Sequence, residues 1–336
     1  MSDQTSPWRG TRVLFTGAQG FIGSWVAERL LEEGAEVFVL DRPPADPSRF
    51  LLRGLHERCT PVAADLLDVE GLRVALDEHG VQAVFHLAAS AIVGSAAASP
   101  LATYDVNVRG TWSLLEACRT ASEPPRRIVI ASTDKAYGAH DELPYRESHA
   151  LQPRYPYDVS KACADMIARS YADTFSLPVA VTRFGNVFGG GDFNFSRVIP
   201  GTVKALLAGE RPVIRSSGLL ERDFLYAADA ASAYLAIGAS LDRPELWGRA
   251  WNASIGEPIS VVKIVRQLIE ISGAQVEPDV RGQGTPHGEL TRQWLDSAAI
   301  AEQLGWAPQW DLQSGLEQTF RWYEHELQRV PAAVGG

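Results

Sequence analysis

The chain has 336 residues, of which 46% are hydrophobic and 21% are charged, and its formal net charge is −10. A chain of this length can bury one large core, or a large domain with a smaller one beside it. The acidic balance and the absence of any run of Lys or Arg exclude the usual features of a nucleic-acid-binding or membrane-surface protein.

The first half of the sequence alternates short apolar runs with helical patterns. Strands are expected at residues 12–16, 36–40, 83–86, 127–131 and 178–182, and helices at residues 21–33, 69–79, 101–120 and 157–175. Gly34 stands where a glycine ends the first of these helices. Strands that alternate with helices at this spacing form βαβ units, so the predicted fold class is α/β, with a Rossmann-type, doubly wound parallel sheet.

After residue 183 the alternation of strands and helices gives way to loops that contain Gly and Pro. Shorter helices are expected there at residues 196–208, 228–238, 260–272 and 312–327. Asp229 is expected to cap one of these helices. We predict that residues 1–183 form the Rossmann domain and that residues 184–330 form mainly a smaller substrate-binding lobe. No linker-like stretch divides the two parts.

A glycine-rich turn joins the first strand to the first helix and indicates a dinucleotide site. Its candidate cofactor-binding residues are Gly17, Gln19, Gly20, Phe21, Ile22 and Gly23. Glycines let the backbone approach a pyrophosphate, and the helix N-terminus supplies N–H groups and a positive dipole end. Asp41 follows the second strand, where a carboxylate accepts hydrogen bonds from a ribose and repels a 2′-phosphate. NAD is therefore the predicted cofactor, and the neighbouring Arg42 makes that preference over NADP moderate.

Tyr157 and Lys161 form the one Tyr-x-x-x-Lys pair of the sequence. On a helix these residues lie one turn apart on the same face. A nearby ammonium group is expected to lower the tyrosine pKa from about 10. The phenolate could then take a proton from a hydroxyl group while hydride leaves the adjoining carbon for a nicotinamide.

Thr133, Asp134 and Lys135 follow the strand at residues 127–131. Strand C-termini face the ligand crevice in a doubly wound fold, so this run places a potential acid and a potential base there. The alternative interpretation is a structural salt bridge between Asp134 and Lys135 at a turn.

Together with the G-x-x-G-x-x-G spacing, these motifs make the chain resemble the extended short-chain dehydrogenase/reductase family from about residue 11 to about residue 308. The resemblance implies that the Thr133 hydroxyl bonds the oxygen being oxidised. It also implies further cofactor contacts, from Asp65 and Leu66 beside the adenine and from Leu87, Ala88 and Ala89 along the cofactor.

Within that family, Thr133-Asp134-Lys135 is similar to the nucleotide-sugar 4,6-dehydratases, whereas simple epimerases usually carry small or apolar residues after the threonine. The pattern looks like that of the CDP-glucose type, and a Gly-Gly-Gly-Asp run at residues 189–192 is similar to that type too. Residues 138–144 depart from it. Inverting UDP-N-acetylglucosamine dehydratases share the Thr-Asp-Lys run, so the nucleotide is left open.

The resemblance implies an NAD-dependent lyase that oxidises C4 of a nucleotide-hexose, eliminates water across C5 and C6, and returns hydride to C6. Asp134 would have to hold a proton and Lys135 to be neutral, and burial favours both. Which of the two carries the proton is left open. An NDP-sugar 4-epimerase is the alternative function, and a non-catalytic nucleotide sensor on the same fold is a third.

The resemblance also points to residues that bind the sugar diphosphate. These are Asn186, Arg197, Arg215, Arg222 and Arg292, of which Arg222 is the best candidate because a guanidinium makes paired hydrogen bonds to oxyanions. For Arg215 and Arg292 a solvated side chain is the alternative. The helices at residues 101–120 and 157–175 correspond to a dimer interface in the family, so a homodimer is expected.

Three scattered cysteines favour neither a disulfide framework nor a metal site, and no metal is expected. The polar first ten residues do not resemble a signal peptide, and no apolar run approaches the ~20 residues of a membrane span. We therefore expect a cytoplasmic enzyme that acts on a nucleotide sugar, without nucleic-acid or membrane partners.

Overall fold

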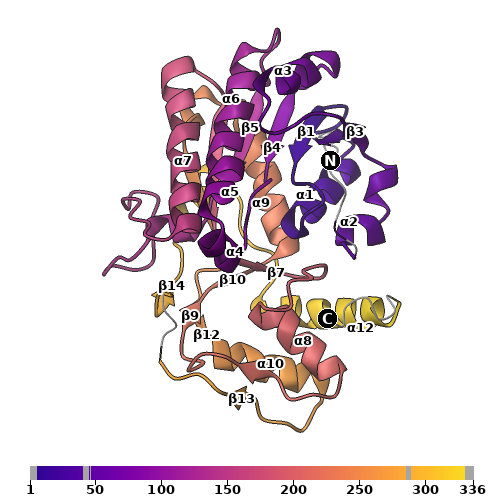
Figure 1. The fold of residues 1–336 in the computed structure, drawn as a ribbon, viewed down its shortest axis with the longest axis vertical. Helices are drawn as coiled ribbons and strands as arrows, with labels where there is room; N and C mark the ends of the chain where they lie inside the picture. The colour runs from indigo at the N-terminus through magenta and orange to yellow at the C-terminus, as the bar shows by residue number, and fades with distance from the viewer. Residues whose placement is uncertain (1–5, 41–44, 46, 285–288, 330–336) are drawn as a thin grey trace.

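A parallel sheet of seven strands forms the centre of the computed structural model, which describes residues 6–40, 45, 47–284 and 289–329 (Figure 1). Its order is β11-β6-β5-β4-β1-β2-β3. The strands are β1 (Arg12–Thr16), β2 (Glu36–Leu40), β3 (Thr60–Val62), β4 (Ala83–His86), β5 (Arg127–Ala131), β6 (Val179–Phe184) and β11 (Ala250–Ala253). The chain crosses over between β3 and β4, so the direction of winding reverses beside β1 and β4 and leaves a ligand crevice there. The predicted doubly wound α/β fold is confirmed.

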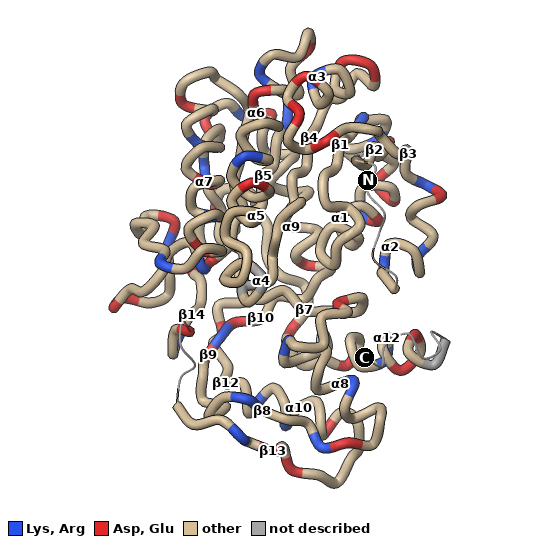
Figure 2. The backbone as a smooth tube through the Cα atoms, in the orientation of Figure 1, with Lys and Arg blue, Asp and Glu red and all other residues tan. Residues whose placement is uncertain are grey.

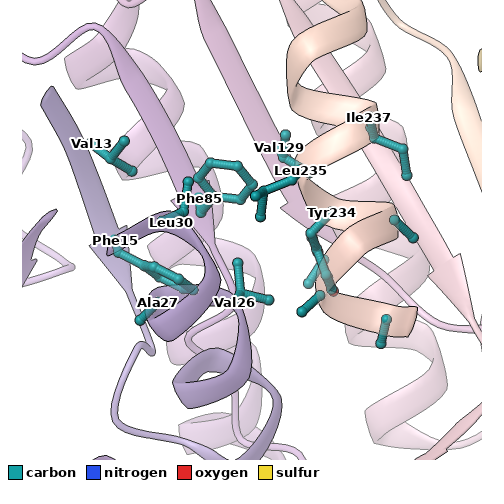
Figure 3. Close-up of a cluster of buried hydrophobic side chains, with 14 of the residues drawn as sticks. Val13, Phe15, Val26, Ala27, Leu30, Phe85, Val129, Tyr234, Leu235 and Ile237 are labelled. Atoms are coloured by element: carbon teal, nitrogen blue, oxygen red, sulfur yellow. The ribbon is translucent and has the colours of Figure 1, made fainter. Parts of the chain in front are cut away.

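Helices cover both faces of this sheet. One face carries α1 (Phe21–Glu32), α9 (Ala227–Ser240) and α11 (Ala298–Leu304), and the other carries α3 (Val69–Glu78), α6 (Gly110–Thr120) and α7 (Pro156–Phe175). The inner strands supply apolar side chains to both layers, because successive residues of a strand point to opposite faces. Thus Val13 and Phe15 pack toward α1 and α9, as Figure 3 shows, whereas Leu14 packs toward α3 and α6.

A second apolar cluster holds the lobe that lies beyond the carboxyl ends of the strands (Figure 1). Its helices are α8 (Val198–Leu207), α10 (Val261–Ser272) and α12 (Leu312–Arg329). Short strands complete it: β7 (Asn186–Phe188) pairs with β10 (Phe224–Tyr226), β9 (Glu221–Arg222) with β12 (Ile259–Ser260) and β14 (Arg292–Gln293), and β8 (Val213–Ile214) with β13 (Asp279–Val280). Residues after 184 also return to the large sheet as α9 and β11, so the second half of the chain serves both parts.

The helix predicted at residues 101–120 is divided into three segments. These are α5 (Pro100–Tyr104), a π-helical turn η2 (Asp105–Arg109) and α6. Asn107 in the π turn is 1% exposed; its Oδ1 accepts the Ser90 N–H at 2.7 Å and its Nδ2 donates to Ser160 Oγ at 2.8 Å. The widened turn therefore lets one side chain join the β4 loop to α7, a device often found near functional sites.

The remaining short elements are α2 (Arg49–Leu52), α4 (Val93–Ala98), η1 (Leu55–Glu57), η3 (Asp134–Tyr137) and η4 (Pro244–Leu246). Gly34 follows α1 with φ of 86°, as predicted for a terminating glycine. The expectation for Asp229 was wrong: it lies in the first turn of α9, and its carboxylate accepts the N–H groups of Gln309 and Trp310. It therefore holds a distant segment rather than its own helix end.

Acidic and basic residues alternate over the part of the chain drawn in colour in Figure 2, without a long basic segment. Among the helices of the described residues, none has the length and apolar character required to cross a membrane.

Candidate active site

Thr133 and Asp134 lie at the carboxyl end of β5, where the chain turns into η3. Thr133 is extended and begins this short helix, because its hydroxyl accepts the Lys135 N–H at 3.3 Å. The same hydroxyl donates to Asp134 Oδ1 at 3.0 Å. Thr133 is 8% exposed and Asp134 4% exposed. The turn thus places a nearly fully buried carboxyl group beside the mouth of the crevice.

Helix α7 brings Tyr157 and Lys161 to the same place. Pro156 is the first residue of the helix, a position at which its fixed φ and missing N–H are favourable. The helix packs against β5, β6 and η3, and a hydrogen bond connects Tyr157 with Thr133. Tyr157, Thr133 and Asp134, which the sequence motifs singled out separately, therefore form one cluster, and Lys161 lies one turn along α7 from Tyr157.

A buried ion pair fixes the position of α7. Arg183 on β6 donates from Nε and Nη2 to the two carboxylate oxygens of Asp165, at 2.7 and 2.9 Å. Its Nη1 donates to Tyr137 Oη in η3 at 3.0 Å. Both charged side chains are at most 1% exposed. One guanidinium therefore connects β6, α7 and the turn that carries Asp134.

Burial changes the protonation of the cluster. The Tyr157 pKa is raised to about 12, first by burial and then by the charge of Asp134, which corrects the expectation that Lys161 would lower it. Burial lowers the Lys161 pKa to about 8. Burial also raises the Asp134 pKa against the opposing effects of Lys135, Thr133 and Arg222. A protonated Asp134 removes the charge that opposes ionisation of Tyr157, so the two groups are linked.

Lys135 does not form a salt bridge with Asp134 among the ion pairs of the described residues. Its Nζ instead lies 3.9 Å from Glu289 Oε2, and the same oxygen accepts from Arg222 Nη2 at 2.8 Å. Asp158 adds a further carboxyl group, whose pKa is raised to about 6 by burial although the charge of Lys135 opposes this. The site therefore contains several basic and several acidic side chains near one another, rather than one structural salt bridge between Asp134 and Lys135.

The glycine-rich turn lies at the crevice between β1 and β4. Gly17 has φ of 82°, and a Cβ there would lie 2.5 Å from Ala88 N. A Cβ on Gly23 would lie 2.0 Å from Gly17 O. Gly20 precedes α1 without a side-chain cap, and the first turn of α1 contains no acidic residue. The backbone of the turn is thus too tightly packed for a side chain at Gly17 or Gly23. The N–H groups at the start of α1 are not capped by a carboxylate from the first turn of that helix.

The other predicted cofactor residues are placed as follows. Gln19 lies in the turn itself, and Phe21 and Ile22 open α1. Leu87 continues β4 through its N–H bond to Thr16 O, and it is followed by Ala88 and Ala89. Asp65 and Leu66 follow β3; Asp65 is exposed and accepts the Leu67 N–H at 2.9 Å. Asp41 and Arg42 lie outside the described residues.

Three of the predicted substrate-binding residues face the site from the lobe. Arg222 is 7% exposed and is held by Glu289 and by the backbone oxygen of Leu290 at 2.6 Å. Arg197 pairs with Asp192 at 2.9 Å, and its charge acts on Tyr157. Asn186 Nδ2 donates to Asp223 O at 3.4 Å. These side chains surround the catalytic cluster on the lobe side.

Arg292 and Arg215 are placed differently. Arg292 is opposite Glu221 in the β14–β9 ladder, and its Nε lies 2.8 Å from Glu221 Oε2. Since neighbouring residues of a strand point to opposite faces, this pairing directs Arg292 away from the face that carries Arg222. Arg215 is exposed just after β8. For both Arg215 and Arg292, the structure therefore fits the alternative that the side chain is solvated rather than directed at the substrate.

Four residues of this site are not part of the motifs that predicted it: Asn107, Asp158, Asp223 and Glu289. Two of them adjoin residues of those motifs, since Asp158 follows Tyr157 and Asp223 follows Arg222. The position of each acidic residue directly beside a motif residue could therefore have indicated that it belongs to the site. Nothing in the local sequence of Asn107 or Glu289 indicates that their side chains reach the catalytic helix or Lys135.

The sequence is similar to a known protein family and to characterised relatives. A family model described as GDP-mannose 4,6 dehydratase matches residues 14–319. The chain is 30% identical over 332 residues to the CDP-glucose 4,6-dehydratase of Salmonella typhimurium, with 94% of this chain and 91% of that relative covered. The predicted resemblance to this group of dehydratases is thereby confirmed.

Solved structures include both dehydratases and epimerases. The crystal structure of DesIV, a dTDP-glucose 4,6-dehydratase from Streptomyces venezuelae with NAD and TYD bound, superposes with a TM-score of 0.85 at 30% identity, covering 96% of this chain and 99% of that one. The UDP-glucose 4-epimerase of Thermotoga maritima with UDP-glucose gives a TM-score of 0.84 at 27% identity, covering 94% and 100%. Fold similarity alone does not separate these two activities.

Proposed function

Because this chain belongs to the GDP-mannose 4,6-dehydratase family, we propose that it is an NAD-dependent nucleotide-sugar 4,6-dehydratase, a hydro-lyase that makes a 4-keto-6-deoxy sugar nucleotide. CDP-glucose is the favoured substrate, on the similarity to the Salmonella enzyme and the Thr133-Asp134-Lys135 run. The observation that carries the proposal is the buried Asp134 beside Thr133 and Tyr157. The cytoplasm stays the predicted location.

The β1–α1 turn fits a dinucleotide. The backbone around Gly17 and Gly23 leaves no room for a Cβ, so only glycine permits this approach, and the helix N–H groups are available to a pyrophosphate. Crystal structures of related dehydratases and of a UDP-glucose 4-epimerase contain bound NAD. When bound, NAD would accept the hydride from C4 of the sugar and later supply the hydride for C6.

The oxidation depends on Tyr157, Lys161 and Thr133. Tyr157 takes the proton of the C4 hydroxyl as the C4–H bond breaks, and the Thr133 hydroxyl bonds the oxygen that becomes the ketone. Lys161, buried and with its pKa lowered to about 8, keeps a positive charge near neutral pH and stabilises the phenolate. Because the Tyr157 pKa is raised, the phenolate that acts as the base forms only when neighbouring groups stabilise its negative charge.

The elimination depends on Asp134 and Lys135. The C4 ketone acidifies the C5 proton, which Lys135, after it has given up its own ammonium proton to solvent, takes as the C5–C6 double bond forms. Lys135 returns this proton to C5 when hydride reaches C6. Asp134 gives its proton to the C6 hydroxyl, the C6–O bond breaks and water leaves. Burial holds the Asp134 proton in place until then. Lys135 must first be released from Glu289, and the sugar diphosphate can do this by replacing Glu289 at Arg222.

A 4-epimerase is the second candidate, supported by the likeness to the Thermotoga enzyme. It would use Tyr157, Lys161 and Thr133 and return hydride to the other face of C4. An epimerase has no use for a protonated carboxyl group beside the sugar, and Asp134 therefore favours the dehydratase.

The function is tested by incubation with CDP-, dTDP-, UDP- and GDP-hexoses, with and without added NAD, followed by mass spectrometry. We expect loss of one water, fastest with CDP-glucose, without net consumption of NAD. An epimerised hexose of unchanged mass from any member of the panel would contradict the proposal. Water loss that proceeds with added NADP but not with NAD would contradict the cofactor assignment.

A further inference from the structure

Asp223 has a buried carboxyl group with one oxygen left without a partner. The residue lies between β9 and β10 and is 1% exposed. Its Oδ2 accepts hydrogen bonds from Ser254 Oγ and from the Leu295 N–H, the latter at 3.0 Å. Its Oδ1 has no hydrogen-bond partner among the described residues. A buried polar atom in this state requires an explanation.

Gly185 stands between this carboxyl group and that of Asp134. A Cβ built on Gly185 would lie 2.4 Å from Asp223 Oδ1 and 3.7 Å from Asp134 Oδ2. Both oxygens therefore border the space that a side chain at position 185 would fill. Asp134 is 4% exposed, so little water can screen one group from the other.

We propose that Asp223 is a positioning residue for the dehydration: its carboxyl group and that of Asp134 share one proton across Gly185, so that Asp134 stays protonated until it acts. The inference rests on the proposed function. Two buried carboxyl groups that face each other do not both ionise, because like charges repel strongly where water is excluded. In agreement, burial, with the charge of Asp134, raises the pKa of Asp223 to about 7. The pair titrates as a unit.

The surroundings of Asp134 explain why such a partner is needed. Lys135 on its own turn and Arg222 on β9 favour its anion, as does the Thr133 hydrogen bond. The other titratable groups that face it are Tyr157 and Asp158 on α7 and Tyr145 in the loop after η3. Burial opposes the two cations, and under this proposal the negative charge of Asp223 adds to the effect of burial. On Asp223 itself, the Ser254 and Leu295 hydrogen bonds favour the anion, which draws the shared proton toward Asp134.

The test is the pH dependence of water loss in a single turnover, compared between the wild type and Asp223→Asn. The variant removes the negative charge and keeps the side-chain size, so Asp134 should lose its proton at lower pH. We expect the alkaline limb of the profile to move toward acid by about one pH unit. A merely structural role would lower the rate at every pH and leave the midpoint in place, and that result would overturn the proposal.

Asp229→Asn is the matched control, because Asp229 is also a buried carboxylate of this half of the chain but binds backbone N–H groups of 309–310. Its midpoint should equal that of the wild type. Should Asp223→Asn not fold, Ser254→Ala serves instead: it removes a bond that stabilises the Asp223 anion, draws the proton toward Asp223, and should move the limb in the same direction.

Infrared spectroscopy separates this inference from the proposed function, since it needs no turnover. The wild type at pH 7 should show the carbonyl band of a protonated buried carboxyl group, and both Asp134→Asn and Asp223→Asn should lose it. A band that Asp223→Asn leaves unchanged would refute the shared proton. If the band behaves as expected but no nucleotide-hexose loses water, the proton pair stands and the proposed reaction fails.

Discussion

Opposing influences act on the proton of Asp134. Burial raises the pKa of this carboxyl group, whereas Lys135, Thr133 and Arg222 lower it, and the net effect is upward. Desolvation is the larger influence because the group is almost fully enclosed, while the Lys135 side chain is 27% exposed and its charge is partly screened. At the residue scale the fold therefore provides an acid, which is what water elimination requires and simple epimerisation does not.

Replacement of Asp134 by Asn should separate the two halves of the reaction. The amide cannot protonate the C6 hydroxyl, so the variant should oxidise C4 and then stall, with NADH absorbance accumulating after mixing with substrate. Product formation should slow by ~10²–10⁴. Tyr157→Phe should instead block the oxidation and give no NADH signal. Water loss at the wild-type rate by Asp134→Asn would remove this residue from the mechanism.

At the scale of elements, the site depends on how α7 is attached to the sheet. The bidentate pair of Arg183 and Asp165 joins β6 to the middle of the helix, one turn beyond Lys161. Asp165 also acts on Lys161, whose pKa it holds up against burial. The same ion pair therefore positions the helix and supports the charge of Lys161.

Asp165→Asn should be strongly destabilising, because it leaves the Arg183 guanidinium buried without a counter-charge. We expect a loss of about 3–5 kcal/mol in the free energy of unfolding, measured by urea denaturation. The matched control is Asp242→Asn, which breaks the pair with Arg127 at a carboxylate that is 62% exposed and should cost less than about 1 kcal/mol. Equal losses in the two variants would contradict the role given to the buried pair.

At the scale of the whole molecule, the layer of α5, α6 and α7 presents apolar side chains to solvent. Leu101 is 78% exposed, Met166 53% and Trp112 39%, and α7 packs beside both α5 and α6. Exposed apolar groups on one helical layer favour association with a second copy of the same surface. The homodimer expected from the sequence stays a prediction, with this layer as its interface.

Light scattering should give the mass of a dimer at micromolar concentration for the wild type. The double variant Leu101→Lys, Met166→Lys should be monomeric with an unchanged circular dichroism spectrum, because the lysines would be buried without partners in the interface. Leu219→Lys is the control, since Leu219 is 66% exposed but lies in the lobe. A monomeric wild type would refute the dimer, and a dimeric double variant would refute the interface.

The sequence by itself determined the doubly wound sheet, because continuous apolar runs between helical patterns have few other solutions. It placed β1, β2, β4 and β5 at the bounds found in the structure. It failed for β3 and β11, which are short and contain Pro61 and the buried Asn252. Asn252 is accommodated by hydrogen bonds to Tyr137 and to the backbone of Tyr145. No local pattern could indicate partners so distant along the chain.

The same division holds for the site. Tyr157 and Lys161 lie one helical turn apart, so their spacing indicated that they act together. Thr133 and Asp134 were indicated by their place at the end of a strand and by the family resemblance. The tertiary structure decided that Asp223 and Asp134 both border Gly185, that Lys135 lies near Glu289, and that the Tyr157 pKa is raised. Desolvation and charge depend on everything packed around a group, and these neighbours come from segments that only folding brings together.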